Sequence, residues 1–452
     1  MIELDNIKSV YFIGIGGIGM SALARYFGER GVKVSGYDRT PTPLTRQLEA
    51  AGMAIHYEDD PALADKAAGL VVYTPAVPSS HRELAYYREQ GFPVWKRSDV
   101  LEAITRTLFS ITVAGTHGKT TISSFIAHIL RHSGYGCNAF LGGITVNYHT
   151  NFWSNARETA VIEADEYDRS FLKLHPDIAV LTAMDPDHLD IYGTPEALEE
   201  AFIQYTAQLG SEGLLVYKHG LARSRELKGA KRISYSLENN AADIYAENIR
   251  LDNGGYIFSI CRKDWMIDNL QLNIGGMHNV ENTVAAVAVA HHLGIGNEQI
   301  RAAVAAFKGV KRRFEYIVRN VHTVYIDDYA HHPEELRALI QSARSLFPDK
   351  QCTVVFQPHL YTRTRDLADG FAESLSLADE VILLPIYPAR ELPIPGIQSE
   401  LIAEKIKGDR AKVMDKAGCL NLLQEQRPEL LITAGAGDID QLVQPIKDFL
   451  DN

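Results

Sequence analysis

The sequence predicts a three-domain α/β protein whose sheets are mostly parallel. Its 452 residues favour about three domains, at roughly 150 residues per domain. Strand-like and helix-like runs alternate along most of the chain, which is typical of parallel sheets with helices on both faces. Two of the first strand-to-helix connections are glycine-rich turns, at Gly14–Gly19 and Gly115–Gly118.

Composition excludes several classes of protein. Hydrophobic residues make up 46% and charged residues 23%, an ordinary globular balance. With 57 acidic and 45 basic residues, a formal charge of −12 and no long Lys/Arg run, we expect no nucleic-acid binding. No apolar stretch approaches about 18 residues and no signal-peptide pattern opens the chain, so we expect no membrane contact and a cytoplasmic location. The four cysteines form no CxxC pair, which predicts neither a disulfide framework nor a cysteine metal site.

The first block, residues 1–107, is predicted to be Rossmann-like. A strand at Ser9–Ile15 leads through a GxGxxG turn into a helix, and a second strand at Lys33–Tyr37 ends on Asp38. Such a turn brings backbone N–H groups against a diphosphate, and an acid about 20 residues later can contact a ribose hydroxyl. The pattern predicts nucleotide-diphosphate binding and leaves open a dinucleotide or a nucleotide-sugar. The candidate residues are Gly14, Gly16, Gly17, Gly19 and Asp38.

The second block, residues 108–312, carries a phosphate-binding loop. A strand at Phe109–Ala114 precedes the loop, and an amphipathic helix follows it. A glycine-rich turn with a lysine and a hydroxyl at a helix start is what wraps a triphosphate and Mg²⁺. Val113 stands where the full eight-residue motif has glycine, so the loop is a shortened variant that still predicts ATP binding. The candidate residues are Gly115, Thr116, His117, Gly118, Lys119, Thr120 and Thr121.

Two acidic clusters follow later strands of this block, at Glu163–Asp168 and Asp185–Asp190. Residues just past the ends of parallel strands gather at the edge where the phosphate loop lies, so one carboxylate and one histidine could complete Mg²⁺ shells. The alternative is a solvated surface of helix-capping acids.

The rest of the second block has two further features. Short alternating strands between Asp243 and Asn273 predict an antiparallel insertion. A long helix at Asn279–Leu293 follows it, and amides at its start could either cap the helix or bind adenine edges. Both readings stay open for Asn279 and Asn282.

The third block, residues 313–452, again alternates strands and helices and is predicted to be Rossmann-like. Arg312 and Arg313 lie at its junction, where an arginine can reach phosphates or simply form a solvated linker. The paired histidines His331 and His332 have no suitably spaced third ligand, so no metal site is predicted there.

Taken in series, the motifs resemble those of one family. GIGGIGMSALA, AGTHGKTT, EADEYD, DHLDIYG, HNVENTVAA, RRF, DDYAHHPEE and FQPHLYTRTRDL are similar to the Mur ligases, ATP-dependent amide-forming enzymes of bacterial cell-wall precursor synthesis. The resemblance implies an N-terminal domain that holds the UDP part of UDP-N-acetylmuramate, a central ATPase and a C-terminal domain that brings the amino acid. It favours a nucleotide-sugar over NAD at the first turn.

The resemblance also implies residue roles. Lys119 would hold the β- and γ-phosphates, Thr120, Glu163 and His188 would bind Mg²⁺, and Arg313 would contact the phosphates. Asn279 and Asn282 match adenine-binding positions and Asp328 a ribose contact. His359 and Arg363 match the amino-acid segment, with Arg363 as the carboxylate anchor and His359 as the candidate general base.

Two positions bear on the branch of the family. Phe202 or Ile203 replaces the carbamylated lysine of the sibling ligases for D-glutamate and diaminopimelate, and Leu360 stands where many relatives have arginine. The missing lysine is similar to the branch that adds L-alanine and to the ligase for recycled tripeptide, which is the alternative. The segment QPHLYTRTRDL and the loop Ile386–Glu391 look like the alanine-adding branch, although Leu360 is a departure from the pattern of the amino-acid pocket. A nicotinamide oxidoreductase is the more distant alternative. We expect a monomer or weak homodimer.

Overall fold

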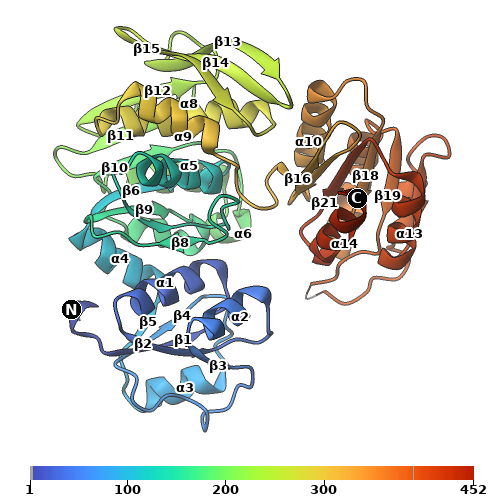
Figure 1. The fold of residues 1–452 in the computed structure, drawn as a ribbon. Coiled ribbons are helices and arrows are strands. Elements are labelled where there is room, and N and C mark those ends of the chain that lie inside the picture. Colours follow the sequence, from blue (N-terminus) through green and yellow to red (C-terminus); the bar gives the residue numbers. More distant parts are fainter. Residues whose placement is uncertain (1–3, 390, 452) are drawn as a thin grey trace. The chain divides into compact units, whose positions relative to one another are not determined.

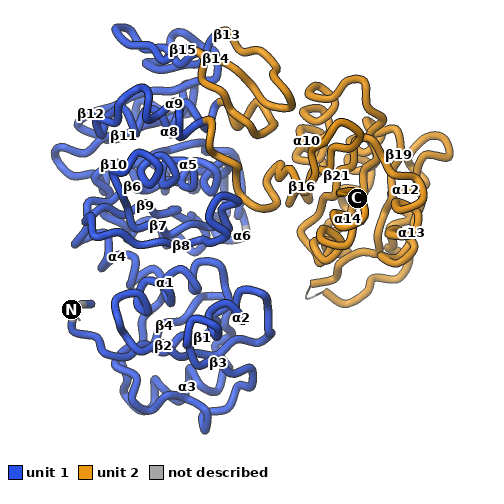
Figure 2. Tube along the Cα trace, in the orientation of Figure 1, with its two compact units in different colours: residues 1–247, 259–268, 281–304 blue, residues 248–258, 269–280, 305–452 orange. Residues whose placement is uncertain are grey.

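The computed structural model describes residues 4–389 and 391–451 and confirms the α/β prediction (Figure 1). Strands form three sheets in which most neighbours are parallel. The chain divides into two compact units (Figure 2). Unit 1 is residues 1–247, 259–268 and 281–304, and unit 2 is residues 248–258, 269–280 and 305–452. The predicted boundary at residue 107 lies inside unit 1.

The first sheet has five parallel strands in the order β3-β2-β1-β4-β5. Its strands are β1 (Ser9–Ile13), β2 (Lys33–Tyr37), β3 (Ala54–His56), β4 (Leu70–Tyr73) and β5 (Val94–Lys96). Its helices are α1 (Ile18–Glu29), α2 (Pro43–Ala50), α3 (Arg82–Glu89) and α4 (Arg97–Thr107). The glycine turn therefore lies at the carboxyl edge of the central strand, β1.

The second sheet has ten strands in the order β15-β14-β13-β12-β11-β10-β6-β9-β7-β8. Its strands are β6 (Phe109–Ala114), β7 (Asn138–Phe140), β8 (Phe152–Trp153), β9 (Thr159–Glu163), β10 (Ile178–Leu181), β11 (Leu214–Lys218), β12 (Lys231–Ser236), β13 (Ile244–Asp252), β14 (Gly255–Arg262) and β15 (Trp265–Leu272). Its helices are α5 (Lys119–His132), α6 (Leu189–Tyr192), α7 (Pro195–Thr206), α8 (Met277–His292) and α9 (Asn297–Ala306). Strand β6 pairs in parallel with β9 and β10, which places the phosphate loop between the loops that follow those two strands.

The predicted insertion forms β13 to β15. Asn253 and Gly254 both have positive φ, 44° and 71°, as a two-residue hairpin turn requires. Within unit 2, the hydroxyl of Tyr316 donates to the carbonyl of Gly254 at 2.6 Å. The hairpin end is thus fastened to strand β16.

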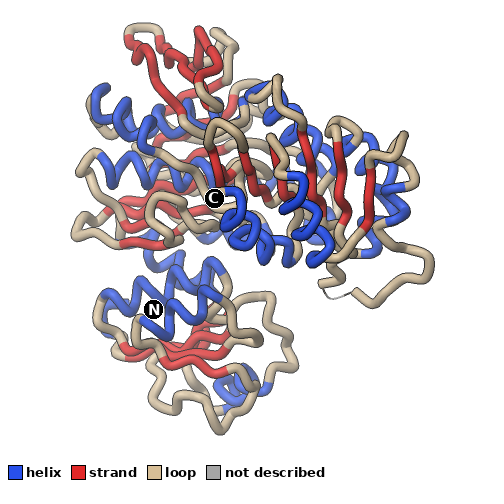
Figure 3. Tube along the Cα trace, turned by 45° about the vertical axis from the view of Figure 1, so that its right-hand side comes forward, coloured by secondary structure: helices blue, strands red, loops and turns tan. Residues whose placement is uncertain are grey.

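The third sheet lies in unit 2, with the order β16-β17-β21-β18-β19-β20. Its strands are β16 (Glu315–Arg319), β17 (Val324–Asp328), β18 (Cys352–Phe356), β19 (Glu380–Leu383), β20 (Ala411–Val413) and β21 (Leu430–Ala434). Only β16 runs antiparallel to its neighbour. Figure 3 shows helices on both sides of these strands: α10 (Pro333–Leu346), α11 (Tyr361–Leu375), α12 (Glu400–Ala403), α13 (Lys416–Gln426) and α14 (Val443–Leu450).

One apolar core runs through both sheets of unit 1. The ring of Tyr26 on α1 lies 5.3 Å from that of Phe140 on β7. The buried amide of Asn151 donates to the carbonyl of Ile18 at 2.5 Å and to the hydroxyl of Ser21 at 3.1 Å. Because the core is continuous, the glycine turn and the phosphate loop are held in one packed body.

Two of the exclusions drawn from composition can be compared with the structure. Among the described residues, no helix is both long and apolar enough to cross a membrane. All four cysteines are buried free thiols.

A buried polar cluster lies on the α3 side of the first sheet. The Glu83 carboxylate accepts from the Tyr11 hydroxyl at 2.5 Å and lies 3.5 Å from the His56 ring. Asp59, Asp60 and Tyr87 add negative or acidic neighbours. Burial raises the pKa of Glu83 to about 7, although the Tyr11 hydrogen bond opposes the change. Folding therefore favours the protonated carboxyl.

Glu83→Gln should change how the stability of unit 1 depends on pH. The folded pKa of Glu83 lies above its ordinary 4.5, so the folded state binds more protons and wild-type stability falls as pH rises from about 4.5 to 7. The glutamine variant lacks this loss, so its stability relative to wild type should be greater at pH 8 than at pH 5. Urea unfolding followed by tryptophan fluorescence reports on unit 1, which contains Trp95, Trp153 and Trp265.

Glu89→Gln, an exposed change on the same helix, is the matched control and should leave the midpoint unchanged. A larger loss of stability for Glu83→Gln at pH 8 than at pH 5 would show instead that the cluster needs the charged carboxylate.

Candidate active site

The phosphate loop joins the end of β6 to the start of α5 in unit 1. Gly115 and Gly118 have φ values of +131° and +81°, which side chains other than glycine rarely adopt. A Cβ atom at Gly115 would lie 2.1 Å from Thr182 Oγ1 and 2.7 Å from the Ala183 nitrogen. The glycine therefore allows the loop to pass against the segment that follows β10.

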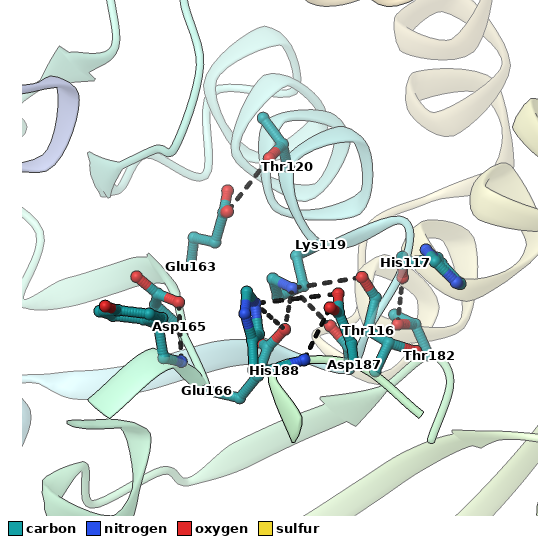
Figure 4. Close-up of polar contacts among 12 residues, drawn as sticks. Thr116, His117, Lys119, Thr120, Glu163, Asp165, Glu166, Thr182, Asp187 and His188 are labelled. Carbon is teal, nitrogen blue, oxygen red and sulfur yellow. Dashed lines mark hydrogen bonds and ion pairs between the residues drawn. The ribbon is translucent and has the colours of Figure 1, made fainter. Parts of the chain in front are cut away.

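Lys119 is enclosed by its own loop and by an acid from the loop that follows β9 (Figure 4). Its ammonium donates to the carbonyl of Gly115 at 2.6 Å and to Glu166 Oε1 at 2.7 Å. Glu166 is only 1% exposed. Burial raises the pKa of Glu166, and the Lys119 charge opposes the change.

Glu163, at the end of β9, contacts the first turn of α5. Its Oε1 accepts from the Thr120 hydroxyl at 3.0 Å, and its Oε2 accepts from the Gly142 N–H at 3.0 Å. Burial also raises the pKa of this carboxyl. The structure therefore brings together two of the three predicted metal residues, Thr120 and Glu163.

His188 lies in a different group of ligands. Its Nε2 is 3.9 Å from Glu166 Oε1 and 3.8 Å from Asp187 Oδ2. Within the part of the chain that the structure describes, these three side chains are grouped so that one ligand atom of each lies within 4.8 Å of the others. The family resemblance assigns Glu163 and His188 to metal binding and does not single out Glu166.

The glycine turn of the first sheet is shaped by Asp38. Its Oδ2 accepts from the Gly16 N–H at 2.7 Å, and its Oδ1 accepts from the Thr40 N–H at 3.2 Å. Gly17 begins α1 without a side-chain cap, so N–H groups of the first turn are available to an anion. The predicted UDP residues thus lie close together: Gly14, Gly16 and Gly17 form the turn, Gly19 is in the first turn of α1, and Asp38 after β2 contacts Gly16.

A cavity of about 300 Å³ lies between this turn and the end of β9. Its lining includes Gly17, Gly19, Thr74, Arg97, Glu163 and Asp165. Arg97, at the start of α4, was not singled out from the sequence. A Cβ atom at Gly19 would lie 2.6 Å from its Nη1, and its Nη2 lies 3.4 Å from Asp165 Oδ2. The only signal in the sequence is its place directly after β5, at the carboxyl edge of the sheet.

The two asparagines of α8 have different surroundings. The side-chain oxygen of Asn282, in unit 1, lies 3.0 Å from the Cβ position of Gly118, so this amide lies against the phosphate loop. The amide of Asn279, in unit 2, donates to the carbonyl of Gly275 at 2.7 Å, which is a contact at the helix start.

In unit 2, Asp328 and Arg313 lie where the third sheet begins. Asp328 accepts from the N–H of Phe314 at 2.6 Å and from that of Ala330 at 2.7 Å. The Arg313 guanidinium lies 5.5 Å from the centre of the Tyr329 ring. Burial raises the pKa of Asp328, and the Arg313 charge opposes the change.

The predicted amino-acid residues also lie at the carboxyl edge of this third sheet. The His359 ring stacks on Tyr387 at 5.8 Å and lies 6.3 Å from the ring of His331. Arg363 is in the first turn of α11, and its Nη1 is buried with no hydrogen-bond partner among the described residues. Leu360 has a φ of +70°. Arg390, in the loop Ile386–Glu391, lies outside the described residues.

Three family models match the chain in order. They are the Mur ligase family catalytic domain at residues 9–108, the Mur ligase middle domain at 113–290 and the Mur ligase glutamate ligase domain at 312–437. The chain belongs to the Mur ligase family. This membership decides for a ligase over a nicotinamide oxidoreductase.

Individual Mur ligases match over nearly their whole length. The UDP-N-acetylmuramate–L-alanine ligase of Phocaeicola vulgatus is 50% identical, covering 100% of both chains. The enzyme of the same name from Parabacteroides distasonis is 48% identical over 99% of this chain and 98% of its own.

Solved structures of two Mur ligases superpose on this chain over nearly its whole length. The UDP-N-acetylmuramate–alanine ligase of Thermotoga maritima superposes with a TM-score of 0.82 at 28% identity, covering 98% of each chain. A murein peptide ligase from Psychrobacter arcticus, 23% identical, shares the fold with a TM-score of 0.68 over 98% of this chain and 99% of that one. These matches favour the alanine-adding branch of the Mur ligases over the recycling alternative.

Gly115→Ala should weaken nucleotide binding. The added methyl meets Thr182 and the Ala183 backbone, so the loop must shift, and we expect affinity for a non-hydrolysable ATP analogue to fall about tenfold or more. Isothermal titration calorimetry measures it. Gly134→Ala is the matched control, because its φ is +81° but nothing lies within 4 Å of the added Cβ. An equal loss in both variants would mean that a general loss of stability, and not the contact with Thr182, accounts for the effect.

Proposed function

We propose that this chain is an ATP-dependent ligase that joins L-alanine to the lactyl carboxylate of UDP-N-acetylmuramate in peptidoglycan precursor synthesis. The observation that carries the proposal is the cavity in unit 1, which is lined both by the glycine turn and by Glu163 beside the phosphate loop. An anionic nucleotide-sugar bound at the turn would have its reactive end beside the ATP phosphates. The names of relatives that are 43–50% identical support the same reaction.

ATP would be held by the phosphate loop. We propose that Gly115–Thr121 wraps the phosphates, with Lys119 on the β- and γ-phosphates and Arg313 as a second cation. Asn279 and Asn282 would bind adenine and Asp328 the ribose. The contact between Asn282 and Gly118 supports a place for Asn282 at the nucleotide.

The side chains present fit Mg²⁺. The Thr120 hydroxyl and the Glu163 carboxylate converge at 3.0 Å beside the phosphate loop, and Mg²⁺ prefers such oxygen ligands. We propose that Thr120 and Glu163 hold Mg²⁺ at the phosphates and that His188 serves a second cation position beside it. When bound, the ion neutralises charge on the phosphates.

The reaction needs no nucleophile from the protein. A lactyl carboxylate oxygen attacks the γ-phosphorus of ATP. The bond between that phosphorus and the oxygen that bridges the β- and γ-phosphates breaks, so that ADP is released and an acyl phosphate is formed. The amine of L-alanine, after losing a proton, attacks the acyl carbon, and the tetrahedral intermediate expels phosphate to give the amide. The chain contributes alignment and charge neutralisation, chiefly through Lys119 and Arg313.

The amino acid would bind in unit 2. We propose that Arg363 pairs with the carboxylate of L-alanine, since one of its nitrogens is buried without a partner in the described structure. His359 is our candidate for the base that takes the ammonium proton. The ring of His331 lies beside that of His359, and burial lowers the pKa of His331.

The remaining features of the proposal concern the whole molecule. We propose three functional domains, residues 1–107, 108–312 and 313–452, for UDP-sugar, ATP and amino acid. A cytoplasmic location suits a reaction that consumes ATP and the four free, buried thiols. We propose a monomer or weak homodimer.

Phosphate release tests the reaction directly. Enzyme with Mg²⁺-ATP and UDP-N-acetylmuramate should release phosphate when L-alanine is added, and should do so less with glycine or L-serine. Lys119→Ala should release none yet still bind UDP, because the glycine turn is intact. Phosphate release with the recycled tripeptide but not with L-alanine would show that L-alanine is not the amine substrate.

Arg97→Gln should weaken UDP-N-acetylmuramate selectively. The Arg97 guanidinium lies beside the first turn of α1. The guanidinium and the positive N-terminal end of this helix both face the cavity, so an anion between them is favoured. We expect the KM for UDP-N-acetylmuramate to rise about tenfold or more, with the KM for ATP unchanged. Arg106→Gln, an exposed change on the same helix, should alter neither. A higher KM for ATP would show that Arg97 belongs to the nucleotide site.

A further inference from the structure

We propose that Glu166 exchanges cations: it holds Lys119 when the phosphate loop is empty, and it binds a divalent cation together with His188 and Asp187 when ATP takes the lysine. The proposal rests on the proposed function, since it requires ATP at the loop. It concerns a residue that the sequence analysis did not select.

Lys119 cannot serve two phosphates, the carbonyl of its own loop and Glu166 at once. In this structure its ammonium is occupied by the carbonyls of its own loop and by Glu166 Oε1 at 2.7 Å (Figure 4). An ammonium has three donors, so two phosphates together with the short bond to the Gly115 carbonyl leave none for Glu166. The move would leave a carboxylate that is 1% exposed without its positive partner, which is unfavourable.

The side chains of Glu166, His188 and Asp187 are placed so that they could bind a replacement cation. Glu166 Oε2 is buried and has no hydrogen-bond partner in the described structure. His188 Nε2 lies 3.9 Å from Glu166 Oε1 and 3.8 Å from Asp187 Oδ2, too far for hydrogen bonds. Two ligands on one Mg²⁺ at about 2.1 Å lie roughly 3 to 4 Å apart, so these distances suit a shared ion.

Glu166 and His188 are also held in place by two tyrosines. The hydroxyl of Tyr192 donates to the backbone carbonyl of Glu166 at 2.6 Å, and the ring of Tyr167 meets the His188 ring edge-on at 5.4 Å. These contacts do not involve Lys119. The ligands can therefore keep their positions when the lysine leaves.

Glu166→Gln gives effects of opposite sign with and without metal. In EDTA, loss of the carboxylate charge releases Lys119, so a non-hydrolysable ATP analogue should bind several-fold tighter than to wild type. With the analogue bound, Mn²⁺ affinity measured by electron paramagnetic resonance should fall about 10- to 100-fold. A merely structural role would weaken both.

Two controls make the test specific. Asp168→Asn, in the same loop and paired with Lys96, should change neither measurement. In a Lys119→Met background, Glu166→Gln should no longer tighten metal-free binding, because no lysine remains to be released.

Either of two results overturns the proposal: weaker analogue binding in EDTA, or unchanged Mn²⁺ affinity. Neither measurement uses UDP-N-acetylmuramate or L-alanine, so a wrong acceptor would leave both unaffected. The failure of this inference is thus distinguishable from a failure of the proposed reaction.

Discussion

The parallel pairing of β6 with β9 and β10 is the constraint on which the site depends. Val113 pairs with Glu163 and Ala114 with Leu181, so three strands end at the same level. The loops after them supply the lysine, the carboxylates and the histidine. Because these groups come from strand ends, a slip in the register of β9 would move the carboxylates, and a slip of β10 the histidine, relative to the phosphate loop. The buried strands that prevent such a slip are therefore as important for the chemistry as the ligands.

Much of this could be predicted from the sequence because parallel strands obey a simple rule. The acids near Glu163 and the histidine at 188 follow strands of one sheet, and the rule places them at one edge. It does not say which acid meets which partner. Glu166 pairs with Lys119 across 47 residues, and Arg97 with Asp165 across 68. Such pairings depend on how each loop packs after its strand, which no spacing encodes.

Asp38 shows a second limit of prediction. Its position after β2 predicts a ribose contact, and in the structure both of its oxygens accept backbone N–H groups. The two roles can coexist, because a carboxylate has about four lone-pair sites. A motif identifies the residue, but only the structure reveals that it also shapes the turn.

The same arrangement recurs at the carboxyl edge of all three sheets. Asp38 accepts from Gly16, Glu163 from Gly142, and Asp328 from Phe314 and Ala330. In each case an acid at or just after a strand end accepts hydrogen bonds from the backbone of a neighbouring loop and fixes its conformation. A charged acceptor is well suited to this because its hydrogen bonds are about twice as strong as neutral ones. The residues that a family pattern marks as ligand contacts are then also what keeps the loops in a binding conformation before any ligand arrives, and this preorganisation lowers the entropic cost of binding.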